Sequence, residues 1–333
     1  MENNLRRHIT ERINLGDMVV HKDLAVIPLL SKETGGPDYI TLKEALSDGS
    51  MIVTEVSQGG SVPELKVVNN GKRNVLMLDG EELAGAKQNR VLNTTILVAV
   101  GAGVVIPVSC TEQGRWNYSS SSFSDSGIMM SCSVRSVKSC SVSESLERDQ
   151  SYRSDQRAVW NGIEELHASQ GTSSSTRSMK DSYDARKQDI SSFERAFACQ
   201  DGQCGMAVMI KGRVAGIEMV SRPDAYRQLH VKLIGSYAMD IPMARSGKSG
   251  PDPAKVQKIL ERIMAAKEKH FPSVGLGMDC RYSAKDLVGS ALTVDDWYVH
   301  MAFFRAGTSQ GREPRERMSS MSRRRAYRSG PVE

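Results

Sequence analysis

Apolar runs near the start of the chain predict strands. Residues 18–30 and 51–56 are two such runs, and Val and Ile, which favour strands, are frequent in both. Between them, Thr41 precedes a short helical pattern and Glu44 stands three residues later, the arrangement of a capping box. The predicted order is strand, short helix, strand.

A turn signal and further β-branched runs extend this β-rich part. Residues 64–69 and 74–79 flank Asn70-Gly71, a dipeptide typical of tight hairpin turns, so we expect an antiparallel pair. Residues 91–99 and 104–108 are rich in Val, Ile and Thr and predict two more strands.

The composition changes sharply in residues 117–154, where 15 of 38 residues are Ser and apolar residues are scattered. Such a stretch is typical of a flexible linker or of a long loop packed over the first sheet. The sequence leaves both alternatives open.

Helical periodicity follows the Ser-rich stretch. Apolar residues recur at intervals of three and four in residues 153–167 and 177–198, which predicts two helices. A hairpin is predicted over residues 204–220, with Lys211-Gly212 at its turn.

Two more helices and a group of strands complete the predicted elements. Residues 225–238 and 253–270 have helical spacing, and the second begins with a Pro, a favoured first residue. Residues 275–282 and 288–304 predict strands, the latter interrupted by a turn at Asp295-Asp296. A β-rich part followed by helices and hairpins is typical of an α+β fold and not of a doubly wound sheet.

We predict a single domain over residues 1–305. Its parts are a mainly antiparallel β part, a Ser-rich connection, and a part of helices and hairpins, at residues 15–116, 117–154 and 155–305. Residues 306–333 are expected to form a flexible basic tail.

Composition places the chain among globular proteins. With 333 residues, 39% of them hydrophobic, it can bury a substantial core. The longest apolar run, residues 96–108, is 13 residues long, short of the roughly 20 that span a membrane. Because the N-terminal residues also lack the apolar core of a secretory signal, we expect a cytoplasmic protein with no membrane partner.

The six cysteines form no recognisable framework. Their spacings include no Cys-x-x-Cys and place no His in metal-ligand register. We therefore predict free thiols, mostly buried, and no metal site.

Most of the net charge of +5 comes from the C-terminal end, since residues 306–333 hold seven Arg against three Glu, a balance of +4. An Arg-rich end is typical of a solvated terminus, and nucleic-acid binding is the less favoured alternative.

The densest group of polar side chains lies between two predicted strands, in residues 79–90. It holds three carboxylates, two Gly, a Lys, an amide pair and an Arg, whereas a simple hairpin loop needs only about two to five residues. Its candidate ligand-binding residues are Glu81, Lys87, Gln88, Asn89 and Arg90. The two cations among them, Lys87 and Arg90, suit an anionic group. The alternative is an exposed loop joined by salt bridges.

A second polar segment, residues 107–116, directly follows an apolar strand, where ligand sites are favoured. Cys110 is either a thiolate nucleophile assisted by Arg115 or an unreactive buried thiol. Arg115 and Trp116 extend the candidate binding set, and Trp116 either stacks on a ligand ring or packs at the sheet rim.

Glu82 and Glu112 are the candidate acid and base, one carboxyl with a raised pKa and the other ionised. The alternative for both is that they are buried in the core or form salt bridges. Residues 101–103 lack the third Gly of a dinucleotide fingerprint, and no phosphate-loop pattern occurs.

Long stretches around these residues resemble the signature of the ARG and rhodanese-phosphatase-superfamily-associated protein domain, in which ARG abbreviates ADP-ribosylglycohydrolase. The stretches are residues 78–83, 85–90, 106–110 and 112–116, followed by 153–156, 236–240 and 287–292. The likeness covers roughly residues 8–305, and the Ser-rich span and the tail depart from it.

The resemblance implies an association with NAD or ADP-ribose metabolism. Lys87, Arg90 and Arg115 would then clamp a diphosphate, and Trp116 would stack on adenine. Glu82 and Glu112 would accept hydrogen bonds from ribose hydroxyls or activate water. No cofactor is specified by these residues.

Three functions stay open at this point. The first is a polar pocket that binds a phosphorylated metabolite of the ADP-ribose or NAD type, with or without turnover. The second is a non-catalytic structural protein that forms a homo-oligomer or filament. The third is nucleic-acid binding through the Arg-rich tail.

Overall fold

Both ends of the chain contribute strands to one large antiparallel sheet. The computed structural model describes residues 4–31, 35–57, 61–242 and 250–306. The strand order is β1-β3-β13-β14-β18-β17-β16-β15, with β2 also paired to β3. These strands are β1 (Ile13–Leu15), β2 (Val19–His21), β3 (Leu24–Ser31), β13 (Gln203–Ile210), β14 (Arg213–Val220), β15 (Lys267–Pro272), β16 (Met278–Ala284), β17 (Leu287–Val294) and β18 (Trp297–Arg305).

Two smaller sheets are formed by residues 39–129. The three-stranded sheet has the order β10-β7-β4, and the six-stranded sheet has the order β12-β8-β9-β11-β6-β5. Their strands are β4 (Tyr39–Thr41), β5 (Met51–Glu55), β6 (Glu64–Asn69), β7 (Asn74–Met77), β8 (Glu81–Gly85), β9 (Arg90–Leu92), β10 (Ile96–Val98), β11 (Gly103–Cys110) and β12 (Phe123–Met129). Val53, Val67, Val75 and Ile106 belong to the core that they enclose.

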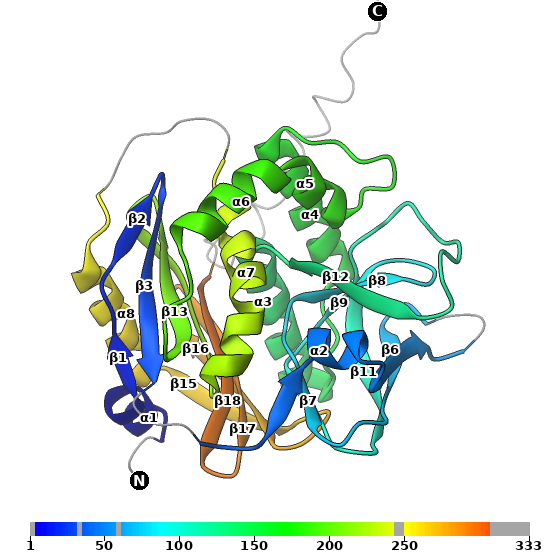
Figure 1. Ribbon diagram of the computed structural model, residues 1–333, viewed down its shortest axis with the longest axis horizontal. Helices are drawn as coiled ribbons and strands as arrows, with labels where there is room; N and C mark the ends of the chain where they lie inside the picture. The colour runs from blue at the N-terminus through cyan, green and yellow to red at the C-terminus, as the bar shows by residue number, and fades with distance from the viewer. Residues whose placement is uncertain (1–3, 32–34, 58–60, 243–249, 307–333) are drawn as a thin grey trace, which may run out of the picture.

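Helices fill the space between the sheets and cover the outer face of the large one (Figure 1). The outer helices are α1 (Asn4–Arg12) and α8 (Pro253–Met264), which share one apolar core with the large sheet. Between the large and smaller sheets lie α3 (Cys132–Asp149) and α7 (Pro223–Ala238). The other helices are α2 (Leu42–Ser47), α4 (Gln156–Gln170), α5 (Met179–Ala185) and α6 (Lys187–Ala196).

The α+β class is confirmed, since the strand pairs are antiparallel except for β4 with β7. The capping box at α2 is also confirmed, because the Thr41 hydroxyl accepts the Glu44 N–H and the Glu44 carboxylate accepts the Thr41 N–H. Lys211 and Gly212, both with positive φ, form the turn between β13 and β14 as predicted.

The prediction of an irregular connection over residues 117–154 is wrong. This stretch contains β12 and the 18-residue helix α3. The buried face of α3 includes Arg135, Ser136, Lys138 and Ser139 as well as apolar residues, so the helix has no apolar periodicity to detect.

The predicted hairpin around Asn70-Gly71 is also wrong. β6 pairs with β5 and β11, whereas β7 pairs with β4 and β10, so the two strands lie in different sheets. The Asn69 amide donates to the carbonyl of Arg73 and also to that of the distant Ala99, a long-range contact that a local turn signal does not report.

The C-terminal part of the chain differs from the prediction. The helix expected over residues 253–270 ends at Met264, and its last part forms strand β15 instead, paired with β16. The basic tail, residues 306–333, lies outside the described residues from 307 onward.

Charged side chains of α3 join the layers inside the molecule. Lys138 pairs with Asp79, which precedes β8, and its ammonium also donates to the Leu92 carbonyl at 2.9 Å. Arg135 pairs with Glu218 of β14 through both terminal nitrogens. All four charged side chains are buried, so each ionised group depends on its partner.

Gly80 gives Arg135 room to reach Glu218. A Cβ at Gly80 would lie 2.6 Å from Arg135 Nε, and its φ of +91° is a conformation that other residues rarely adopt. This glycine of the first polar segment therefore lies against a buried arginine.

We expect the Lys138→Met variant to lose roughly 3–5 kcal/mol of unfolding free energy, because Asp79 would stay buried without its cation. Denaturant unfolding of both proteins measures this. The control is Lys66→Met on the exposed face of β6, which should change stability little. Equal losses in the two variants would contradict the assigned role of the ion pair.

Candidate functional site

The two polar segments identified in the sequence lie side by side. β9 pairs with β8 on one side and with β11 on the other. Arg90 is therefore opposite Leu83 on one neighbour and opposite Cys110 on the other. This pairing brings together the loop after β8 and the residues that follow β11.

Arg115 fastens these two segments to each other. Its Nε donates to Glu112 Oε2 at 2.8 Å, and Nη1 donates to the Ala86 and Asn117 carbonyls at 2.8 and 3.0 Å. Nη2 reaches Asn89 Oδ1 at 3.1 Å, and Glu112 Oε2 also accepts the Asn89 N–H. The guanidinium group is thus engaged by protein acceptors on every nitrogen.

Glu81 and Glu82 are adjacent in β8 and have different partners. Glu81 forms an ion pair with Lys232 of α7 at 2.8 Å and accepts the Leu78 N–H. Glu82 accepts the Thr111 hydroxyl at 2.6 Å, while its second carboxylate oxygen is buried without a partner. Burial raises the pKa of Glu82 to about 7.

Arg90 and Cys110 are both inside the protein. Arg90 Nη1 donates to Gln88 Oε1 at 2.9 Å, and its nearest carboxylate, Glu55, is 3.9 Å away. Burial raises the pKa of the Cys110 thiol, so the thiol is protonated at neutral pH. The side-chain amide of Gln156 bonds both the N–H and the carbonyl of Cys110, as a neighbouring strand would.

Trp116 and Lys87 form the outer side of this cluster. Trp116 is 45% exposed, and Lys87 Nζ lies 5.2 Å from its ring centre and 5.1 Å from that of Tyr118. These distances are typical of cation–π contacts. This is the part of the predicted set that faces solvent.

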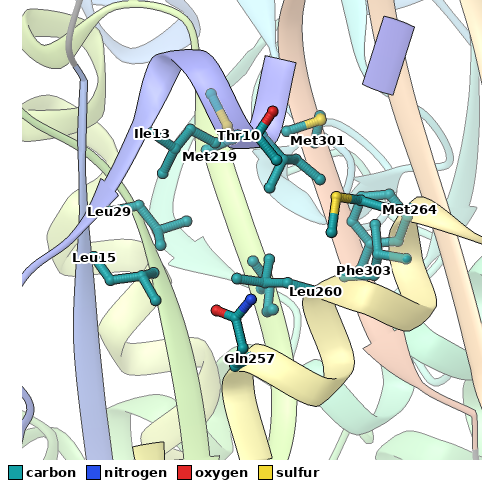
Figure 2. Close-up of a pocket in the computed structure, with 13 residues that line it drawn as sticks. Thr10, Ile13, Leu15, Leu29, Met219, Gln257, Leu260, Met264, Met301 and Phe303 are labelled. Atoms are coloured by element: carbon teal, nitrogen blue, oxygen red, sulfur yellow. The ribbon is translucent and has the colours of Figure 1, made fainter. Parts of the chain in front are cut away.

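The segments that carry the ten predicted residues therefore lie side by side, and none of the ten borders any of four pockets formed by described residues. One of these pockets, about 220 Å³, is apolar and lies between α1, α8 and the large sheet (Figure 2). Two others are bordered by Asp240 and by Tyr152, respectively. The fourth adjoins the second polar segment.

The wall of that fourth pocket is built by two segments that run antiparallel. Gly114 N–H donates to the Thr176 carbonyl at 2.7 Å, and Met179 N–H donates to the Thr111 carbonyl at 2.9 Å. A Cβ at Gly114 would lie 2.9 Å from Thr176 Cα, so only glycine permits this approach. Residues 171–178 thus form an arch against residues 111–114.

The pocket between this arch and helix α4 has a volume of about 400 Å³, and we name it the arginine pocket. Its lining includes two arginines, a tryptophan, a histidine and several amide and hydroxyl side chains. The full set is Gln113, Arg157, Trp160, Asn161, Ile163, Glu164, His167, Ser173, Ser174 and Arg177. Volumes of about 300–1,000 Å³ are usual for small-molecule sites.

Polar groups in the arginine pocket divide into engaged and unengaged ones. Arg177 Nη1 donates to Gln113 Oε1 at 2.9 Å, which holds one guanidinium at the rim. His167 bonds the Ser178 carbonyl through Nε2 and the Thr172 hydroxyl through Nδ1, so both ring nitrogens fix the arch. The indole nitrogen of Trp160 is buried and has no acceptor among the described residues.

Sequence reasoning did not assign Arg157, Trp160, His167 or Arg177 to a site. Asp155 caps α4 by accepting the Arg157 and Ala158 N–H groups. A usable signal was present, since residues 157, 160, 161 and 164 are spaced i, i+3, i+4 and i+7 and share one polar helix face.

We expect the stability of Glu82→Gln relative to wild type to be higher at pH 8 than at pH 5. The folded carboxyl has a pKa of about 7 and the unfolded one about 4.5, so the folded state binds more protons between these values. Wild-type stability therefore falls as pH rises through this window, by roughly 3 kcal/mol from Glu82 alone.

Denaturant unfolding at both pH values tests this expectation, with Glu261→Gln on the exposed side of α8 as the control. The difference between Glu82→Gln and wild type should grow with pH, whereas the control should show no such trend. A difference independent of pH would be evidence against a raised pKa.

Within the described residues, no helix combines the length and apolar character that crossing a membrane requires. No curated protein and no solved structure matches the chain. Comparison with protein families matches residues 12–304, nearly the whole described chain, to the ARG and Rhodanese-Phosphatase-superfamily-associated Protein domain. The match covers far more than half of the sequence and includes both polar segments and the arginine pocket, so the chain belongs to this family.

Proposed function

We propose that the protein binds a phosphorylated metabolite of the ADP-ribose type in the arginine pocket. The observation that carries this proposal is a pocket of about 400 Å³ with an arginine on each of two walls and a tryptophan in its lining. The ligand class is the one expected from the sequence, while the contacting residues differ from those expected.

The arrangement of charge supports an anionic ligand. Arg157 belongs to α4 and Arg177 to the arch, and Glu164 is the one acidic side chain among the lining residues. Guanidinium groups from two walls suit a phosphate or diphosphate, because each presents planar pairs of N–H donors. Gln113 leaves Arg177 with further donors beyond the one that it accepts.

Trp160 supports a ligand with a ring. It belongs to the lining of the arginine pocket, and its indole ring offers an apolar surface for a ribose or an adenine.

Arg115, predicted as part of a clamp, and Glu112, predicted as an acid or base, act in this proposal as the support of the pocket. Arg115 and Glu112 hold the segment that carries Gln113, and Gly114 lets the arch approach it. His167 is the titratable lining residue closest in type to a general base, and both of its nitrogens are engaged. The proposed function is therefore binding, and turnover is not part of it.

The family description supports the same ligand class, since it names association with ARG and rhodanese-phosphatase proteins. Association with ADP-ribosylglycohydrolases would place this protein near ADP-ribose. A site that binds free ADP-ribose fits such an association.

The test is calorimetric titration of the full chain with ADP-ribose, NAD, AMP and inorganic pyrophosphate. We expect ADP-ribose to bind and Arg177→Gln or Arg157→Gln to weaken it about 10- to 100-fold, the effect of losing one charge-assisted bond. Trp160→Phe, which keeps a ring and removes the N–H, should weaken binding less.

Arg195→Gln, an exposed arginine of α6 outside the pocket, serves as the matched control and should bind as wild type does. Binding of pyrophosphate equal to that of ADP-ribose would show that the site reads only the phosphates. Binding that is absent, or unchanged in both arginine variants, would exclude the arginine pocket as the site.

The two other functions predicted from the sequence are tested alongside. Light scattering over a dilution series reports a homo-oligomer or filament, and loss of nucleic-acid binding on deletion of residues 306–333 would report a function of the tail. Neither outcome depends on the arginine pocket.

A further inference from the structure

Three side chains with metal-ligating groups meet on the edge of the large sheet, far from the arginine pocket in sequence. Among the described strands, β15 stands at the end of this sheet and is paired with β16. His270 of β15 is directly opposite Cys280 of β16, and Glu268 is two residues away along β15. Because strand side chains alternate, all three point from the same face.

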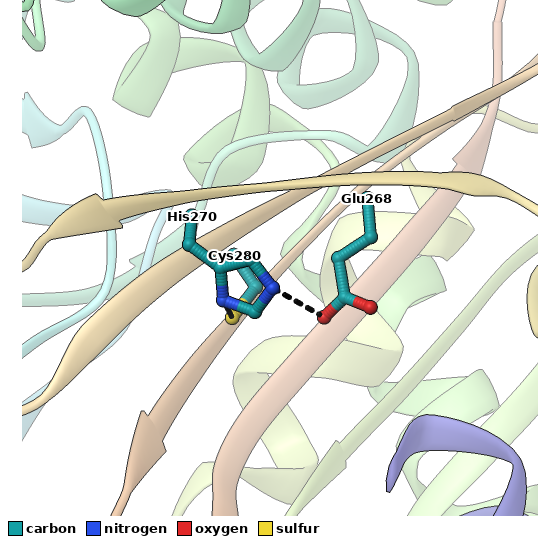
Figure 3. Close-up of side chains that lie close together, drawn as sticks. All are labelled: Glu268, His270 and Cys280. Atoms are coloured by element: carbon teal, nitrogen blue, oxygen red, sulfur yellow. Dashed lines mark hydrogen bonds and ion pairs between the residues drawn. The ribbon is translucent and has the colours of Figure 1, made fainter. Parts of the chain in front are cut away.

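Their ligand atoms are already close together (Figure 3). His270 Nδ1 lies 3.4 Å from Cys280 Sγ, and His270 Nε2 lies 3.4 Å from Glu268 Oε1. One atom from each residue can be chosen so that all three fall within 4.8 Å of one another. Ligands at the corners of a zinc tetrahedron are separated by about 3.3–3.8 Å, given the usual bond lengths.

Neighbouring groups hold two of the three ligands in place. The Tyr282 hydroxyl donates to Glu268 Oε1 at 2.7 Å, and the Thr293 hydroxyl lies 3.8 Å from Cys280 Sγ. Contacts of this kind orient metal ligands in known sites. The His270 side chain is 56% exposed, so its ring is free to turn one nitrogen toward the other two ligands.

We propose that Glu268, His270 and Cys280 bind a zinc ion that joins the edge strand β15 to β16. Sulfur, imidazole and carboxylate together are a donor set for zinc and not for the harder calcium or magnesium ions. Three protein ligands leave the fourth position of a zinc tetrahedron for a water molecule or another small ligand.

Without a bound ion, the Cys280 thiol of this cluster is a poor nucleophile. Burial raises the pKa of Cys280 to about 11, so the thiol is protonated at neutral pH. A bound zinc ion supplies the positive charge that makes the thiolate stable at this buried position, and the thiol proton leaves to solvent.

Sequence spacing did not indicate this site. His270 and Cys280 are ten residues apart and precede and follow a turn, which matches no short metal motif. Only the register of β15 against β16 brings them together. The sequence-based prediction of no metal site is therefore the one that this proposal replaces.

The test uses the full chain, freed of metal with a chelator and then titrated with Co²⁺ as an optical probe and with Zn²⁺ by calorimetry. We expect one equivalent of Co²⁺ to give a thiolate-to-cobalt charge-transfer band with tetrahedral ligand-field bands. Zn²⁺ should displace it and raise the melting temperature by mass action.

Cys280→Ser should abolish the charge-transfer band, and His270→Ala, an exposed position that should not affect folding, should weaken Zn²⁺ at least about tenfold. Cys199→Ser, at a half-buried thiol outside the cluster, is the matched control and should retain full binding. No cobalt band in the wild type, or wild-type affinity in His270→Ala, would overturn the proposal and leave a hydrogen-bonded cross-strand pair.

Discussion

The architecture depends on charges buried in the middle of the molecule. Helix α3 carries Lys138 toward Asp79 of the N-terminal part and Arg135 toward Glu218 of the large sheet, so one helix joins two layers by ion pairs. An ion pair inside a protein tolerates little displacement, since either charge alone would be strongly unfavourable there. The pairs thereby specify how the smaller sheets sit on the large one, which apolar contacts alone would specify less sharply.

Charged side chains that contact protein groups also support the proposed binding site. Arg115 engages Glu112 and the carbonyls of the β8–β9 turn, and this holds the segment that forms one wall of the arginine pocket. His167 and Gly114 set the arch against that segment. Rigid support behind a small number of unengaged donors is what a preorganised site requires. The proposed zinc site is built differently, on the register of an edge strand.

The sequence predicted local structure well where a signal was local. The capping box at Thr41, the Lys211-Gly212 turn and the helix predicted over residues 225–238, observed as α7 (Pro223–Ala238), each have a signal within a few residues. It failed where long-range contacts decide. The Ser-rich stretch forms α3 because Arg135 and Lys138 find distant partners, and Asn70-Gly71 does not close a hairpin because its flanking strands join different sheets.

By itself, the sequence determined the fold class, the family and the location of two polar segments that lie together, since composition, periodicity and motif are properties of the chain alone. Only the tertiary structure decided what those segments contact. Arg90, Glu81 and Glu82 are charged residues that a sequence places at the surface, yet they are buried. The residues with unengaged groups come from α4 and the arch, and the Glu268, His270 and Cys280 cluster from a strand pairing. Partners distant in sequence set burial and pairing, and local pattern carries no record of them.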